Sequence, residues 1–127
     1  MTTQHESYQI KFTEFPDYLY VEIKGTEISV DIIASYIHKI VEKCEASGKN
    51  RILLYRDIPA VLSEGEVFYT VNQSLKALEG KRVALVNPYD VISTAVDFGM
   101  TVGQNRGGNY RSFKNVSDAE AWLLKGV

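Results

Sequence analysis

The sequence predicts an α/β domain in the order ββαβαβαβα, with a mixed, mostly parallel sheet of about five strands and with four helices. Three observations predict it. Hydrophobic spacing switches between a period of two and a period of 3.6 along the chain. Residues 52–55 and 83–86 are short apolar runs, typical of strands buried on both faces. Helical segments alternate with strands after residue 29, which favours parallel pairing through right-handed crossovers. Every segment has a place in one core, so residues 1–127 form a single domain.

The first two strands are predicted to form an antiparallel hairpin. Apolar and polar side chains alternate over residues 8–13 and again over residues 19–24. Pro16 and Asp17 between them are typical turn residues. The polar residues 1–7 are expected to be a flexible tail.

Two amphipathic helices follow, one on each side of the strand at 52–55. The first is predicted between Ser29 and Gly48, with an apolar stripe of Ile33, Ile37, Ile40, Val41 and Cys44. Ser63 and Glu66 have the spacing of a capping box at the start of the second helix. That helix presents an inward face of Val67, Phe68, Val71, Leu75 and Leu78.

The last third of the chain predicts two helices around a short strand. Asp90 is expected to cap the first of these helices, whose inward residues are Val91, Ile92, Ala95, Phe98, Gly99 and Val102. A strand is expected over residues 110–114. Ser117 and Glu120 then suggest a capping box for a final helix that buries Trp122 and Leu123.

Composition narrows the classes of function. The chain has 14 Lys and Arg against 16 Asp and Glu, and a net charge of -2 gives no general attraction to nucleic acid. One cysteine, Cys44, excludes an internal disulfide and fits a reducing compartment. The polar N-terminus and the short apolar runs predict a cytoplasmic protein without a membrane span. Two histidines exclude a three-histidine zinc site, and His38 with Glu42 makes a poor pair of ligands, so we expect no metal and no cofactor.

The element order and several short motifs resemble the SpoIIAA-like domains related to STAS domains, in their uncharacterised branch. The motifs are residues 82–86, Asn105-Arg106-Gly107, Phe113, and the Ala-Glu-Ala-Trp-Leu of residues 119–123. The resemblance implies the fold of these domains. It also implies a non-catalytic regulatory or protein-interaction module, with another protein as its partner.

Regulatory STAS domains carry a phosphorylatable serine in an Asp-Ser-Ser-Gly type of motif between the third strand and the second helix. In this chain that region contains Asp57 and Ser63 but no paired serines. Ser63 is a candidate phosphorylation site, because a helix N-terminus favours a phosphate. The alternative is that Ser63 only caps the helix.

Two groups of polar residues are candidate binding sites. Asp57 and Asn87 follow neighbouring buried strands and are expected at the same rim of the sheet, with Ser63 near them. The second group is Asn105, Arg106 and Gly107. Its glycine-rich backbone suits an anion-binding nest of N–H groups. For both groups the alternative is an ordinary turn or helix end.

Two rival functions and one mode of assembly stay open. The first rival is a domain that binds a small apolar or anionic ligand between the second and third helices, with walls of Phe68, Val71, Phe98 and Val102. An enzyme is the least supported rival, because no nucleophile–base pair or G-x-S-x-G motif is present. Tyr18 and Tyr20 are expected on the hairpin face opposite Leu19, Val21 and Ile23, and the hairpin edge offers a route to a homodimer.

Overall fold

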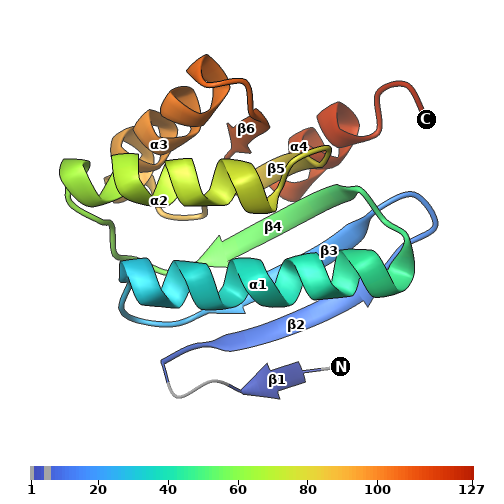
Figure 1. The fold of residues 1–127 in the computed structure, drawn as a ribbon, viewed down its shortest axis with the longest axis horizontal. Helices are drawn as coiled ribbons and strands as arrows, with labels where there is room; N and C mark the ends of the chain where they lie inside the picture. Colours follow the sequence, from blue (N-terminus) through green and yellow to red (C-terminus); the bar gives the residue numbers. More distant parts are fainter. Residues whose placement is uncertain (1, 5–6) are drawn as a thin grey trace.

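A six-stranded mixed sheet runs through the whole domain (Figure 1). The computed structural model describes residues 2–4 and 7–127. The strands follow one another across the sheet in chain order: β1 (Thr2–Gln4), β2 (Gln9–Glu14), β3 (Leu19–Lys24), β4 (Arg51–Asp57), β5 (Arg82–Val86) and β6 (Asn109–Phe113). The first three strands pair antiparallel, and β3 to β6 pair parallel.

Helices cover both faces of this sheet. Their bounds are α1 (Val30–Ser47), α2 (Glu64–Ala77), the 3-10 turn η1 (Asp90–Ile92), α3 (Ser93–Asn105) and α4 (Val116–Leu123). The first three α-helices lie together on one face (Figure 1), where the larger core contains Ile40, Leu54 and Leu85. On the other face α4 encloses a smaller core with Leu53, Ala84 and Leu123.

The predicted fold class is confirmed, including its most specific element. β4 and β5 are parallel neighbours, with Ile52 opposite Val83 and Leu54 opposite Leu85. The five predicted strands correspond to β2 through β6. β1 is additional and lies within residues 1–7, where a flexible tail was expected. Residues 1, 5 and 6 of that tail lie outside the described residues.

The hairpin has the predicted division of faces. Leu19, Val21 and Ile23 are fully buried in the larger core, whereas Tyr18 and Tyr20 belong to the smaller core on the other face. The Tyr18 hydroxyl donates a hydrogen bond of 2.6 Å to a carboxylate oxygen of Glu120 on α4. Because β1 pairs with the outer side of β2, the edge at this end of the sheet is β1.

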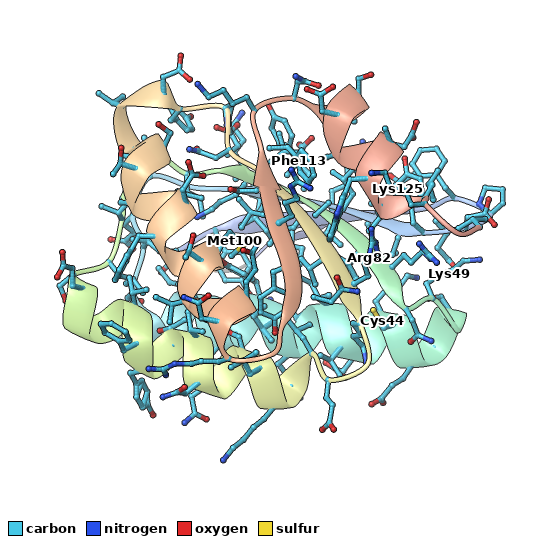
Figure 2. All side chains as sticks on the ribbon, turned by 90° about the horizontal axis from the view of Figure 1, so that it is seen from above. Cys44, Lys49, Arg82, Met100, Phe113 and Lys125 are labelled. Atoms are coloured by element: carbon cyan, nitrogen blue, oxygen red, sulfur yellow. The ribbon has the colours of Figure 1, made fainter. Side chains whose placement is uncertain are left out.

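An arginine and an aromatic residue close the smaller core. The Arg82 guanidinium lies 3.7 Å from the centre of the Trp122 ring and donates to the Trp122 carbonyl at 2.7 Å. Phe113 packs against the same indole, at 5.7 Å between ring centres. Figure 2 shows Arg82 and Phe113 close to α4, whereas Met100 belongs to α3. Arginine suits this position because its planar cation stacks on aromatic rings and its N–H groups bind carbonyls at the helix end.

The apolar stripe of α1 is rotated from the predicted one. Its buried residues are Ile32, Tyr36, Ile40 and Cys44. The predicted residues Ile33, Ile37 and Val41 are half-buried. Ile33 and Ile37 line spaces between α1 and α2, because the two helices lie side by side. Ser29, after which the helix was predicted to begin, caps it by accepting a hydrogen bond from the Ile32 N–H.

The start of α3 differs from the prediction. Asp90 does not cap it, because residues 90–92 form a 3-10 turn and the N-cap residue is Ile92, which has no side-chain acceptor. This turn directs Val91 into solvent, where it is 94% exposed. Phe98 is also exposed, although it was expected to face inward.

The start of α4 is also earlier than expected. Asn115, and not Ser117, is the N-cap: its side-chain oxygen accepts a hydrogen bond of 2.9 Å from the Asp118 N–H. The helix thus begins at Val116. Asparagine is as good an N-cap as serine. The earlier start still buries Leu123 completely, as predicted, whereas Trp122 is half-buried.

Candidate functional site

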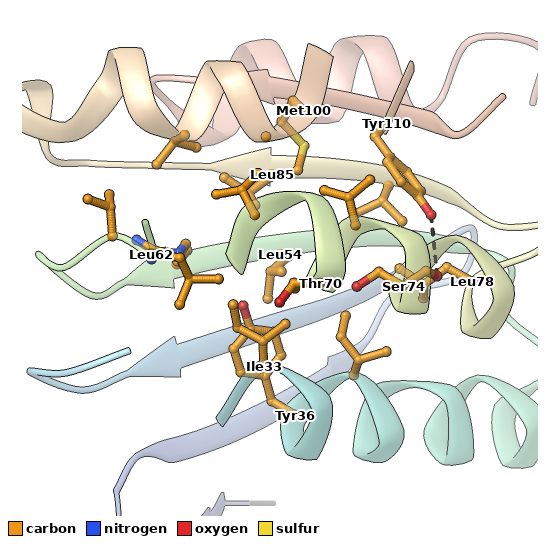
Figure 3. A pocket seen from close by; sticks show the side chains of 18 of the residues that line it. Ile33, Tyr36, Leu54, Leu62, Thr70, Ser74, Leu78, Leu85, Met100 and Tyr110 are labelled. Atoms are coloured by element: carbon orange, nitrogen blue, oxygen red, sulfur yellow. Dashed lines mark hydrogen bonds between the residues drawn. The ribbon is translucent and has the colours of Figure 1, made fainter. Parts of the chain in front are cut away.

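A cavity of about 140 Å³ lies between the sheet and the three helices on its larger-core face. No residue of α2 is buried, even though Val67 and Val71 point inward, because the space lies between this helix and the strands. Figure 3 shows the lining side chains, which come from α1, α2, α3 and the central strands. Most are apolar, such as Ile37, Leu54, Val71, Leu85 and Met100.

One wall of the cavity carries a buried positive charge. Arg56 follows Leu54 by two residues on β4, so both side chains lie on the same face of the sheet. Its side chain is only 6% exposed and lines the cavity. Its guanidinium donates to the carbonyl of Ile58 at 2.8 Å and to that of Ala60 at 2.6 Å. No carboxylate of the described part of the chain forms an ion pair with it.

Two hydroxyl groups add to the polar character of the cavity. Tyr36 on α1 is buried beside Arg56, and burial raises the pKa of Tyr36 while the positive charge of Arg56 partly opposes that rise. Thr70 on α2 has a buried side-chain oxygen with no hydrogen-bond partner among the residues that the structure describes. Both side chains extend from their helices toward the space above the sheet (Figure 3).

The segment between β4 and α2 forms part of the cavity wall. Val61 and Leu62 line the cavity, and Val61 is 42% exposed, so this wall reaches the surface. The bonds from Arg56 to Ile58 and Ala60 fix the path of the segment. The wall of the cavity is therefore connected directly to the N-cap of α2 at Ser63.

Of the four residues predicted as walls of a ligand site, Val71 alone lines this cavity. Phe68 and Phe98 instead contact each other edge to face at the surface, with their ring centres 5.7 Å apart. Val102 is buried at the end of α3 nearer to β6. The cavity lies deeper and nearer to β4 than the sequence indicated, because α2 and α3 touch through their outer aromatic residues.

Asp57 and Asn87 lie at the same rim, joined by a residue that the sequence did not single out. The Tyr89 hydroxyl donates a short hydrogen bond to a carboxylate oxygen of Asp57. Asn87 is buried and exchanges two hydrogen bonds with the backbone of Tyr89, at 3.0 and 3.1 Å. The bond to Asp57, together with burial and the negative charge, raises the pKa of Tyr89. A binding role for Asp57 and Asn87 stays a prediction.

Ser63 has the predicted capping geometry. Its hydroxyl accepts from the Glu66 N–H at 3.4 Å and lies 2.9 Å from a Glu66 carboxylate oxygen, which also accepts from the Ser63 N–H at 3.2 Å. The capping box is therefore confirmed. The residue is exposed. Phosphorylation of Ser63 stays a prediction.

Asn105, Arg106 and Gly107 lie at the opposite end of the sheet from Asp57. Asn105 is the last residue of α3, and all three precede the first residue of β6, whereas Asp57 ends β4, which runs parallel to β5 and β6. The N–H groups of Arg106 and Gly107 donate to helix carbonyls at 3.1 and 3.0 Å, and Gly107 has a φ of 93°. These donors end the helix and are not directed at an anion. The Arg106 guanidinium donates to the Asn72 side chain and lies 5.3 Å from the Phe68 ring centre.

The described residues form neither a metal centre nor a membrane-spanning helix. No group of three or more His, Cys, Asp or Glu side chains is placed to hold a metal ion within the described ranges. Among the same residues, no helix combines the length and the apolar character needed to cross a bilayer.

Similar chains were found among solved structures. An uncharacterised protein of the DUF3478 family from Shewanella loihica PV-4, whose structure is described as having a SpoIIAA-like fold, aligns over 98% of this chain and 99% of its own, with a TM-score of 0.54 and 18% identity. This chain has a SpoIIAA-like fold. The NMR structure of the protein TM1081 aligns over 95% of this chain and 93% of its own, with a TM-score of 0.59 and 14% identity. No protein-family profile and no curated protein sequence matches the chain.

The polar residues of the cavity in this SpoIIAA-like domain were missed from the sequence. Arg56 directly precedes Asp57, and the pair resembles a polar strand end. The available signal was that Arg56 lies two residues after Leu54, because alternation along a strand places both side chains on the core face. Tyr36 had a similar signal, since it lies four residues before Ile40 on α1. For Thr70 the signal was its spacing of three from Val67 and of four from Ser74, which place these residues on one helix face.

Proposed function

We propose that this SpoIIAA-like domain binds a small molecule with a compact apolar body in the cavity beneath α2. The observation that supports this most is a helix without a buried residue above an apolar space. Protein interiors are normally packed as densely as organic crystals. An empty apolar space of this kind destabilises a fold, so its presence is explained when a ligand fills it.

The size of the cavity sets the size of the ligand. Its volume is about 140 Å³. An engineered apolar cavity of roughly 150 Å³ stays dry and accepts benzene. A ligand with about six to eight carbon atoms in its body therefore fits without displacing α2. Its apolar contacts would be with Leu54, Val71, Leu85 and Met100.

Native mass spectrometry of freshly purified protein tests the proposal. The wild type is expected to carry a bound small molecule, or to gain thermal stability from small aromatic compounds such as toluene. Ala95→Leu adds bulk at a cavity-lining position and is expected to abolish both effects. Ala121→Leu, at an exposed position of α4 on the opposite face, is the matched control and is expected to retain them. A wild type that has a clean mass and no response to these compounds would contradict the proposal.

A second candidate is the regulatory protein-interaction module predicted from the sequence. Its support is the position of Ser63, an exposed hydroxyl at the start of α2 that directly follows the cavity-lining Val61 and Leu62. A partner protein that binds this end of α2 would bind with a different affinity when a negative charge is introduced at Ser63. Ser63→Glu and Ser63→Ala are expected to differ in the proteins they co-purify from cell extract, and identical sets would count against this role.

A further inference from the structure

We infer that the molecule bound beneath α2 is a small carboxylic acid, whose carboxylate binds Arg56 while its apolar body fills the cavity. This inference rests on the proposed ligand-binding function and adds the chemical class of the ligand. It depends on four features of the cavity: a buried charge without an acidic partner, spare hydrogen-bond donors, an unpaired hydroxyl and an apolar remainder.

The buried charge of Arg56 is the first feature. A cation that leaves water needs a compensating negative charge or dense hydrogen bonding. Arg56 is 6% exposed, and within the described ranges its charge meets two backbone carbonyls and no carboxylate. The dipoles of two carbonyl groups compensate the positive charge of the guanidinium only in part, whereas an anion would neutralise it. A ligand carboxylate would complete the pairing, and planar bidentate contact between carboxylate and guanidinium is the strongest arrangement available.

Spare donors make room for that ligand without breaking existing bonds. A guanidinium carries five N–H donors. The carbonyls of Ile58 and Ala60 take one each, and the hydroxyl of Tyr36 lies beside the same group. These contacts do not use all five donors. The wall between β4 and α2 can therefore stay in place while a carboxylate binds.

Thr70, which lines the cavity from α2, provides an additional donor. Its hydroxyl is buried and has no partner among the described residues. An unpaired buried hydroxyl is costly, so structures normally satisfy it with protein, water or ligand. A carboxylate accepts several hydrogen bonds at once. The donors of Arg56, Tyr36 and Thr70 come from β4, α1 and α2, so they would hold the acid group between three separate elements.

The charge of the cavity also selects against other ligands. A ligand amine would place a second cation beside Arg56, away from water, where repulsion is strong. A neutral hydrocarbon would fill the apolar part but leave the guanidinium and the Thr70 hydroxyl unpaired. A phosphate monoester would bring a second negative charge, and the lining residues contain no second cation to balance it.

Titration calorimetry with three compounds that share a phenyl body tests the inference on the wild-type chain. Benzoate is expected to bind at least tenfold more tightly than benzyl alcohol, and benzylamine more weakly than either. Equal or tighter binding of benzyl alcohol would overturn the inference and leave the proposed function intact. Failure of all three compounds to bind at millimolar concentration, together with failure of toluene, would overturn both.

Two arginine variants give a matched comparison. Arg56→Met is expected to lower benzoate affinity at least tenfold while changing benzyl alcohol affinity less than threefold. Arg106→Met alters an exposed arginine outside the cavity and is expected to leave both affinities unchanged. Undiminished benzoate binding by folded Arg56→Met would overturn the inference. The comparison of compounds on the wild type decides the question even if Arg56→Met does not fold.

Discussion

Thr70→Val is expected to stabilise the ligand-free protein. The substitution replaces a buried hydroxyl that has no partner among the described residues by a methyl group of similar size, in a cavity whose lining is mostly apolar. A buried polar group without a partner costs about 1–3 kcal/mol. Threonine and valine differ little in helix propensity, so the backbone contributes almost nothing to the change. We expect the free energy of unfolding to rise by about 1–2 kcal/mol.

The gain is measurable by urea unfolding followed by circular dichroism, with calorimetry as a second readout. For a chain of 127 residues, each kcal/mol raises the melting temperature by about 3–5 °C. Thr101→Val is the matched control, because Thr101 is exposed on α3 and its substitution should change stability by less than about 0.5 kcal/mol. If Thr70→Val is no more stable than the control, the description of an unpaired hydroxyl in an apolar cavity is wrong.

Three further predictions concern packing, thiol chemistry and pH. Gly103→Ala should lower the free energy of unfolding in urea by about 1–3 kcal/mol, because a Cβ at this position would lie 2.7 Å from Tyr110. Gly65→Ala is the control and should not lower it, because a Cβ there would have no neighbouring atom within 4 Å. Equal effects of the two substitutions would refute the packing described. Burial raises the pKa of the Cys44 thiol, so native protein at pH 8 should react with DTNB at least tenfold more slowly than unfolded protein, and equal rates would contradict the buried position. Burial also raises the pKa of Tyr36 above its ordinary value of 10.0, so the unfolded chain loses this proton first and stability should fall as the pH rises above that value. Tyr36→Phe should make this fall shallower between pH 9 and pH 11, and an unchanged slope would refute the assignment.

The pattern of the sheet was predictable because it depends on local periodicity. The apolar runs that begin at Ile52 and Val83 were consistent with buried strands, and the structure pairs them directly. The capping box at Ser63 was equally local, since it involves atoms three residues apart. Features of this kind need no knowledge of the remaining chain.

Helix orientation and exact helix starts were less predictable. The buried side of α1 contains Tyr36, because the neighbouring α2 covers part of the apolar stripe that the sequence favoured. Val91 was expected inside but lies within a 3-10 turn, which the residue types alone did not predict. Asn115 and Ser117 are both good N-cap residue types, so the sequence alone did not decide between them, and the structure has Asn115 in this position.

A ligand site beside α2 was one of the alternatives that the sequence left open, but the exact place and lining of the cavity depend on distances between elements, which local patterns do not give. The apolar face of α2 is the same whether this helix packs on the sheet or above a space. The role of Arg56 was hidden for a related reason, because a charged residue at a strand end is usually exposed. The segment from Ile58 to Leu62, together with Tyr36 on α1, encloses the guanidinium.

The central claim, that the space beneath α2 is a ligand site, is tested most directly by methyl NMR during a titration with benzoate. Saturable shifts are predicted for the methyl groups of Leu54, Val71 and Leu85, which line the cavity. The methyl groups of Leu53 and Val86, on the opposite face of the same strands, should not move. Shifts confined to the opposite face, or no saturable shift at all, would contradict the claim.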